Sequence, residues 1–166
     1  MNFLGLGPEH SGAGSRVWVL PVPYEATTTY GKGTARGPEA IIAASQEVEL
    51  YDREFGCEAA MEFGVRTLAP LEIMTGPPSA MVDRIERAAA DVISGSPAPG
   101  VLAILGGEHS ITAGALRGLA EARGSDGLVA VQIDAHADLR DEYDGTPHSH
   151  ACAARRILET CPLFQI

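Results

Sequence analysis

The sequence predicts an α/β fold, a three-layer αβα domain built on a mainly parallel sheet. Two short apolar runs, 101–105 and 128–133, enclose a segment of helical periodicity, which is the order of a parallel strand–helix–strand unit with two adjacent strands buried on both faces. A third apolar run, 16–22, precedes them. Hydrophobic residues make up 45% of the 166 residues, an ordinary share for a globular chain. We therefore expect one domain over residues 1–166.

Local signals predict the remaining elements. The run 16–22 is typical of a buried strand and ends among prolines. Pro38 stands where the first residue of a helix belongs, and helical spacing continues to residue 49. A Pro-Pro pair at 77–78 begins another helix, and 150–160 predicts a last one. The helix after the Pro-Pro pair carries an apolar stripe that we expect in the core: Met81, Ile85, Ala88, Ala89 and Val92.

Polar residues follow the two enclosing apolar runs. The first run stops at Gly106-Gly107 and the second stops at Asp134. The segment 110–123 between them predicts a helix with Ser110 as its N-cap. Because open α/β sheets place ligands at the carboxyl ends of their parallel strands, we expect the polar residues after both runs to lie together.

Charge and composition argue against several classes of protein. The 22 acidic and 12 basic residues give a formal net charge of −10, which argues against a nucleic-acid partner because phosphate neutralisation needs a basic surface. No run approaches the roughly 20 apolar residues of a membrane span, and residues 1–15 lack the pattern of a secretory signal. The cysteines Cys57, Cys152 and Cys161 match no disulfide framework. We expect reduced cysteines, no membrane contact and a cytoplasmic location.

The segment 134–138, Asp-Ala-His-Ala-Asp, offers three potential metal ligands at alternate positions. In an extended strand, the Cα atoms of Asp134 and Asp138 would lie ~13 Å apart, too far to share one ion. The backbone must therefore curl to turn Asp134, His136 and Asp138 toward one point. Imidazole with carboxylates and no thiolate suits Mn²⁺, with Zn²⁺, Co²⁺ and Ni²⁺ as alternatives.

The segment 106–110, Gly-Gly-Glu-His-Ser, has two interpretations. A phosphate-binding loop would need a GxxxxGK[ST] pattern, which is absent, and Lys32 is the only lysine of the chain. The alternative places His109 beside the 134–138 cluster as a further metal ligand, with Glu108 and Ser110 supporting it from outside. The convergence of two strand ends favours this second interpretation.

These motifs, in this order, resemble those of the ureohydrolases, the arginase and agmatinase superfamily. The resemblance rests on 106–110, 134–138, the segment 34–41 (Thr-Ala-Arg-Gly-Pro-Glu-Ala-Ile) and Ser149-His150-Ala151. It covers nearly the whole chain and implies the N-terminal half of an arginase-like fold, truncated at its C-terminal side. A second metal motif of the family, Asp-x-Asp on a later strand, has no counterpart after Ile157.

The resemblance also implies a reaction. His109, Asp134 and Asp138 would hold one Mn²⁺, while His136 and a bridging Asp134 would hold the other. A metal-bridging hydroxide would attack the guanidinium carbon of a small cationic guanidino substrate, releasing urea and an amine. His150 matches the proton-shuttling histidine of the family. A homo-oligomer is also expected. With the second motif missing, we expect one weakly held ion and little urea release if the chain is complete.

The substrate and some alternatives stay open at this stage. The segment around 138–152 resembles agmatinases more than arginases, and Asp141, Glu142 and Asp144 give an acidic loop that suits a substrate cationic at both ends, so agmatine hydrolysis to putrescine and urea is favoured. Guanidinobutyrate and aminopropyl-guanidines remain possible. A non-catalytic fragment acting in metal binding or subunit interaction is one alternative, and a zinc deacetylase of the related fold is another. His148 is expected to be an exposed loop residue.

Overall fold

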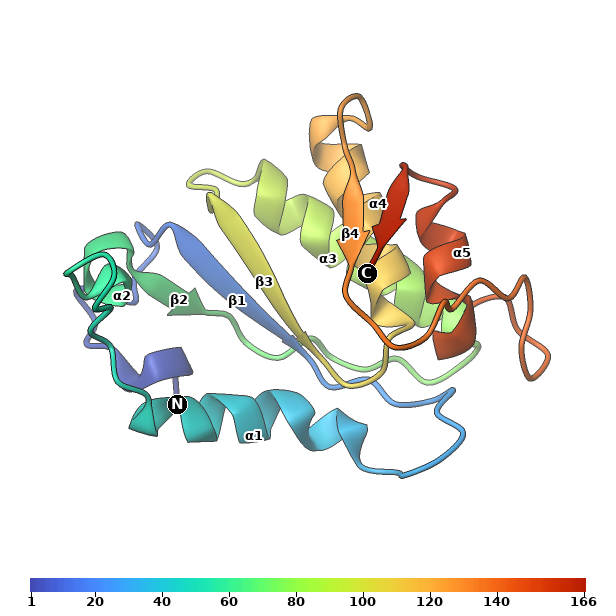
Figure 1. Cartoon of the computed structure of the whole chain (residues 1–166), viewed down its shortest axis with the longest axis horizontal. Helices are drawn as coiled ribbons and strands as arrows, with labels where there is room; N and C mark the ends of the chain where they lie inside the picture. The colour runs from blue at the N-terminus through green and yellow to red at the C-terminus, as the bar shows by residue number, and fades with distance from the viewer.

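A central parallel sheet of three strands organises the first two thirds of the chain. The computed structural model describes all residues, 1–166. Strand β1 (Val17–Val22) lies in the middle, between β2 (Val65–Thr67) and β3 (Val101–Gly106) (Figure 1). All its strand pairs are parallel, as the sequence predicts. Strand β2 was not predicted, because three residues are too short to show a hydrophobic period.

Side chains alternate across β1 and bury both of its faces. Leu20 and Val22 pack against Met81 and Ile85 in one apolar cluster, whereas Val19 belongs to a second cluster on the opposite face. This alternation follows from the two-residue period of a strand. The sheet is therefore a middle layer between two layers of helices, which confirms the predicted three-layer α/β architecture.

Helices α3 (Pro78–Ser94) and α4 (Ile111–Arg123) form the layer on one side of the sheet. They pack closely because α4 carries glycine at the contact. A Cβ atom added at Gly114 would lie 2.5 Å from the Val82 carbonyl oxygen and 3.0 Å from the Ile85 Cβ. The predicted stripe of α3 is confirmed, with Met81, Ile85 and Ala89 buried and Ala88 and Val92 half-buried.

Ser110 occupies the predicted N-cap position of α4 but does not cap the helix with its side chain. Its hydroxyl instead donates to the Glu108 carboxylate at 2.5 Å. A hydrogen bond from the hydroxyl to a charged carboxylate is stronger than one that the hydroxyl would accept from a neutral backbone N–H. The side chain therefore turns toward Glu108.

The other side of the sheet is covered by short elements and by α1 (Gly37–Ala44). Helix α1 ends earlier than the predicted residue 49 and continues only as a 3-10 turn. At this point the Ser45 hydroxyl donates to the Ile42 carbonyl and accepts the Leu4 backbone N–H, both by side-chain hydrogen bonds that compete with helix extension. The remaining short elements are η1 (Phe3–Gly5), η2 (Thr34–Arg36), η3 (Ser45–Glu47) and α2 (Ala59–Phe63).

The C-terminal part departs from the predicted topology. Strand β4 (Ala130–Gln132) does not pair with β3; it pairs in parallel with β5 (Leu163–Gln165) in a separate two-stranded sheet (Figure 1). The connecting helix α4 sets the direction in which the chain returns, but it does not determine which strand becomes the hydrogen-bonded neighbour. The predicted adjacency of these two strands is therefore wrong.

The edge positions of β3 and β4 also explain a second difference. Both apolar runs were expected to be buried on two faces, yet Val101 is 56% exposed and Val131 is 62% exposed. Each strand lies at an edge of its own sheet, so it has a neighbouring strand on one side only. The last predicted helix, 150–160, is also shorter and consists of η4 (His150–Cys152) and α5 (Ala153–Ile157).

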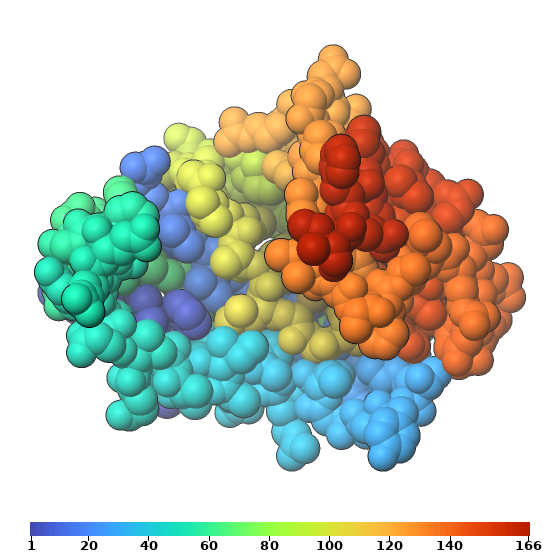
Figure 2. Space-filling model, viewed as in Figure 1, coloured from blue at the N-terminus to red at the C-terminus, as the bar shows by residue number.

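The arrangement brings three distant segments to one corner of the molecule. In Figure 2 the orange and red C-terminal segment lies beside β3, and the light-blue segment that follows β1 passes beneath it. The three cysteines are free, as predicted. No helix is both long enough and apolar enough to cross a bilayer.

Candidate metal centre

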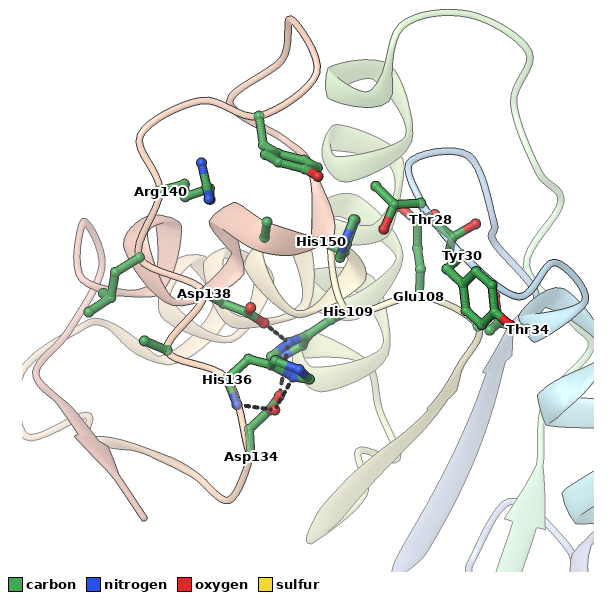
Figure 3. A pocket seen from close by; sticks show the side chains of 16 residues that line it. Thr28, Tyr30, Thr34, Glu108, His109, Asp134, His136, Asp138, Arg140 and His150 are labelled. Atoms are coloured by element: carbon green, nitrogen blue, oxygen red, sulfur yellow. Dashed lines mark hydrogen bonds and ion pairs between the residues drawn. The ribbon is translucent and has the colours of Figure 1, made fainter.

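Three of the predicted metal ligands meet although β3 and β4 do not pair. His109 follows β3, and Asp134 and Asp138 follow β4 (Figure 3). The His109 Nδ1 atom lies 2.7 Å from Asp138 Oδ2 and 3.4 Å from Asp134 Oδ2. One potential ligand atom from each of the three residues lies within 4.8 Å of those of the other two. The two strand ends therefore converge at their carboxyl termini.

The backbone curl predicted for 134–138 is confirmed. Asp138 adopts the left-handed region with φ of 48°, which Asp tolerates better than most residues do. The His136 backbone N–H donates to Asp134 Oδ1 at 2.9 Å, closing a turn around the aspartate side chain. This hydrogen bond is also the main cause that lowers the pKa of Asp134. The curl thus presents Asp134 as a carboxylate.

His136 lies on the open side of this group. Its side chain is 79% exposed, and its Nδ1 lies 3.2 Å from Asp134 Oδ1. His136 thus borders the same cavity as the other two residues of the motif, but it stays outside the group that His109 forms with Asp134 and Asp138. The two histidines nevertheless contact opposite oxygens of one carboxylate, since His109 faces Oδ2 and His136 faces Oδ1. The imidazoles of residues 109 and 136 are thus neighbours across Asp134.

His150 borders the same cavity from η4. Its Nδ1 atom lies 3.3 Å from both Thr27 Oγ1 and Ser149 Oγ. The Tyr143 ring stands edge-on to the imidazole, with the ring centroids 5.9 Å apart. The Arg140 guanidinium lies over the Tyr143 ring at 5.0 Å. Arg140, Tyr143 and His150 all line the cavity. Figure 3 shows Arg140 on the side away from Thr28, Tyr30 and Thr34.

Glu108 fastens the loop after β1 to the end of β3. Its side chain is buried at 4% exposure. The Oε2 atom accepts the backbone N–H groups of Ala26 at 2.6 Å and Thr27 at 2.7 Å. The Oε1 atom accepts the hydroxyls of Thr27 at 2.7 Å and Ser110 at 2.5 Å. Glu108 therefore contacts the loop and not the metal-ligand group.

Two further features hold this loop in place. Gly107 packs against the Tyr24 carbonyl so closely that any Cβ would overlap it, which is the close approach expected of the paired glycines. Glu25 accepts the backbone N–H groups of Gly33 at 2.9 Å and Ala35 at 3.0 Å. The Ala35 and Gly33 hydrogen bonds lower the pKa of Glu25 to about 2. Glu25 thus closes the loop on itself, and the close contact between Tyr24 and Gly107 anchors it to the end of β3.

The cavity between these groups has a volume of about 950 Å³. The loop after β1 contributes Thr28, Tyr30 and Thr34 to its lining. None of the three acidic residues 141, 142 and 144 lines it, so in this structure the acidic loop does not face the cavity. Asp141 instead pairs with Arg155 at 2.7 Å on the surface, because an exposed carboxylate pairs with the nearest guanidinium.

His148 is a further correction. It is half-buried and not an exposed loop residue. Its Nδ1 atom is buried without a hydrogen-bond partner. Burial lowers the pKa of His148, and the nearby Arg117 and Arg156 lower it further. The residue therefore belongs to the contact between helices and does not line the cavity.

The donor set fits a divalent cation. Two carboxylates and one imidazole converge, with a second imidazole at the rim, and no cysteine belongs to the group. Oxygen and imidazole nitrogen donors without thiolate suit Mn²⁺ and related ions better than a structural zinc site. Residues 109, 134 and 138 would provide the tighter part of such a site, and His136 would complete it from the open side.

Sequence reasoning missed two residues of this site. Thr27 makes hydrogen bonds to groups 81 and 123 positions away in the chain. Arg140 lines the cavity from the segment whose acidic residues suggested a cationic substrate. No local pattern marks either residue, because their contacts depend on the tertiary structure.

Comparisons with known proteins agree with this geometry. Residues 15–165 match the model of the arginase family. The chain is 41% identical over 150 residues to an N(1)-aminopropylagmatine ureohydrolase from Synechocystis sp., which covers 90% of this chain and 49% of that protein. It is 34% identical over 143 residues to an agmatinase from Pyrococcus horikoshii, covering 85% and 47% of the two chains.

Solved structures show the same fold. The agmatine ureohydrolase of Thermoplasma volcanium superposes with a TM-score of 0.76 at 29% identity, over 95% of this chain and 49% of that one. The proclavaminate amidino hydrolase from Streptomyces clavuligerus superposes with a TM-score of 0.84 at 25% identity, over 99% and 55% of the chains. The chain spans about half the length of the curated relatives it matches. Its sequence and its fold show that it belongs to the arginase family.

Proposed function

We propose that this chain forms the metal-binding part of a manganese-dependent hydrolase of guanidino compounds. The observation that carries the proposal is the meeting of His109, Asp134 and Asp138 within contacts of 4.8 Å, with His136 on the second oxygen of the central carboxylate. A guanidinium has a pKa above about 12 and is a poor electrophile, so neutral water does not attack it. Divalent metal, when bound, lowers the pKa of water so that hydroxide is available near neutral pH.

The residues of the chain have distinct parts in this proposal. Asp134, Asp138, His109 and His136 would hold the metal. His150 delivers a proton to the amine that leaves, because an imidazole can release and take up a proton and this one lines the same cavity.

For the substrate, we propose an amine with a guanidino group of the agmatine type. The relatives named above act on agmatine or on its N(1)-aminopropyl derivative, according to their names. Agmatine would give putrescine and urea. The cavity of about 950 Å³ exceeds the size of agmatine and leaves room for the longer substrate, so both are tested together.

Location and assembly are part of the same proposal. Three free cysteines, two of them buried, suit a reducing compartment such as the cytoplasm. The apolar side chains of Val131 and Phe164, which are register partners in the β4–β5 pair, are 62% and 63% exposed, which supports a homo-oligomer. Sedimentation of the chain at several concentrations tests the assembly.

Calorimetric titration with MnCl₂ tests the metal centre. We expect saturable binding to the chain and its loss in Asp134→Asn, which removes the charge of the central carboxylate. Asp126→Asn is the matched control, because Asp126 is exposed, does not belong to the ligand group and does not line the cavity. Equal binding by both variants would contradict the proposed site.

Product assays with Mn²⁺ then separate the possible activities. Urea release from agmatine or from N(1)-aminopropylagmatine supports the hydrolase. Manganese binding without urea supports a metal-binding or subunit-interaction module, and acetate release from an acetylated amine supports the related-fold zinc deacetylase. Either of the last two results overturns the guanidino hydrolase for this chain.

A further inference from the structure

We propose that Thr27, held by Glu108, is a positioning residue that fixes the tautomer of His150. In this tautomer, Nδ1 carries the hydrogen and Nε2 is the basic nitrogen. The inference rests on the proposed function in one respect only: it gives the fixed tautomer a use, the delivery of a proton into the cavity. The tautomer itself follows from hydrogen bonding alone.

The Thr27 hydroxyl has a single hydrogen, and Glu108 receives it. The two oxygens lie 2.7 Å apart. A carboxylate only accepts hydrogen bonds, whereas a hydroxyl gives one hydrogen and accepts through its lone pairs. Glu108 is buried and also accepts two backbone N–H groups and the Ser110 hydroxyl. Its geometry is thus fixed from four directions, and the hydrogen of Thr27 is committed to it.

Toward His150, the Thr27 oxygen can therefore act only as an acceptor. It accepts the His150 backbone N–H at 2.9 Å. The same oxygen lies 3.3 Å from His150 Nδ1. With no hydrogen left on Thr27 to offer, this second contact is attractive only if Nδ1 carries a hydrogen.

Ser149 is the competing influence on the same nitrogen. Its Oγ atom also lies 3.3 Å from Nδ1, and its hydroxyl is buried at 1% exposure. In the opposite tautomer Ser149 would donate to Nδ1. The Nδ1 lone pair would then face a lone pair of the Thr27 oxygen, which is repulsive. With the hydrogen on Nδ1, no lone pairs are opposed, and Thr27 cannot relieve the repulsion in any other way because Glu108 holds its hydrogen. This tautomer is therefore the one that Thr27 favours.

The consequence concerns the direction of proton delivery. Nε2 makes no hydrogen bond to any protein group, and His150 lines the cavity. If Nδ1 were the basic nitrogen, the exchanging proton would sit against the wall between Thr27 and Ser149. With Nδ1 fixed as the donor, protonation and deprotonation occur at Nε2.

Long-range ¹H–¹⁵N spectra of the histidine rings test this tautomer directly. They are recorded at the alkaline end of a pH series, where the ¹⁵N shifts no longer change and the ring is neutral. The signals of His150 are identified by their loss in His150→Gln. We expect the wild-type Nδ1 shift to be that of a protonated nitrogen and the Nε2 shift to be that of an unprotonated one. The opposite pattern in the wild type overturns the inference.

Three variants assign the effect to Thr27. Thr27→Val keeps the shape and removes the oxygen, so the two ¹⁵N shifts are expected to move toward each other or exchange. Thr27→Ser keeps the hydroxyl and restores the wild-type pattern, and Ser149→Ala leaves it unchanged. An unaltered pattern in Thr27→Val, or a reversal in Ser149→Ala, contradicts the role of Thr27. If Thr27→Val fails to fold, the wild-type and Thr27→Ser spectra still decide whether Nδ1 carries the hydrogen.

These measurements are independent of catalysis. The spectra need neither metal nor substrate, so a chain that binds no manganese and releases no urea still reports its tautomer. Conversely, urea release with the opposite tautomer would leave the proposed function standing and remove only the role of Thr27.

Discussion

The loop between β1 and α1 depends on one buried carboxylate, and replacing that carboxylate with an amide tests the dependence. Glu108 is 4% exposed and accepts four hydrogen bonds, two of them from the loop backbone at Ala26 and Thr27. Glu108→Gln keeps the length and shape of the side chain. It removes the charge and replaces one acceptor oxygen with an NH₂ donor.

We expect this change to lower the free energy of unfolding by about 2 kcal/mol. Hydrogen bonds to charged groups contribute about 1.5–3 kcal/mol each, against about 0.5–1.5 kcal/mol for neutral ones. The backbone N–H groups cannot rotate away, so the amide oxygen stays on them and each bond loses about 1 kcal/mol. The hydroxyls of Thr27 and Ser110 can rotate and accept from the new NH₂ group, so they add little to the loss.

Urea denaturation followed by far-UV circular dichroism at neutral pH measures this loss. Glu121→Gln is the matched control, because Glu121 is exposed on α4 and makes no ion pair or side-chain hydrogen bond. A control change within about 0.5 kcal/mol is expected for such a surface position. If Glu108→Gln falls within the same range, the loop is not held by the carboxylate and the reasoning is refuted.

Three further substitutions test other parts of the structure. Gly114→Ala places a Cβ 2.5 Å from the Val82 carbonyl, so overpacking of about 1–3 kcal/mol should outweigh the helix-propensity gain of about 1 kcal/mol and lower the urea midpoint; an unchanged or higher midpoint would show that α3 and α4 separate easily. Burial lowers the pKa of His148 from 6.5, so its neutral form contributes stability that is present above pH 6.5 and is lost as the pH falls. His148→Gln should therefore lose less stability than the wild type between about pH 7.5 and pH 5.5, and equal losses in the two proteins would contradict this. Backbone hydrogen bonds lower the pKa of Glu25 from 4.5 to about 2, so its contribution is present above pH 4.5 and is lost toward pH 2; Glu25→Gln should speed amide exchange in its loop at neutral pH, and unchanged exchange rates would exclude an anchoring role.

Much of the candidate site could be predicted because its signals are local. The curl of 134–138 was predictable because an extended strand would keep Asp134 and Asp138 too far apart to share one ion. In the structure the left-handed backbone of Asp138 is part of this curl. The close approach at Gly107 follows from the absence of a side chain. The stripe of α3 follows from a helical period that any buried helix must satisfy.

Other features could not be predicted because they depend on contacts between distant segments. The sequence alone determined that β3 and β4 are strands, each followed by metal-ligand candidates, since apolar runs, turns and motif residues are encoded within a few positions. Only the tertiary structure decided that β4 pairs with β5, that His136 lies on the open side, and that Thr27 reaches residues 81 and 123 positions away. The physical reason is that strand partners and buried hydrogen bonds are chosen by which surfaces meet after the chain has folded, and no local pattern records that choice.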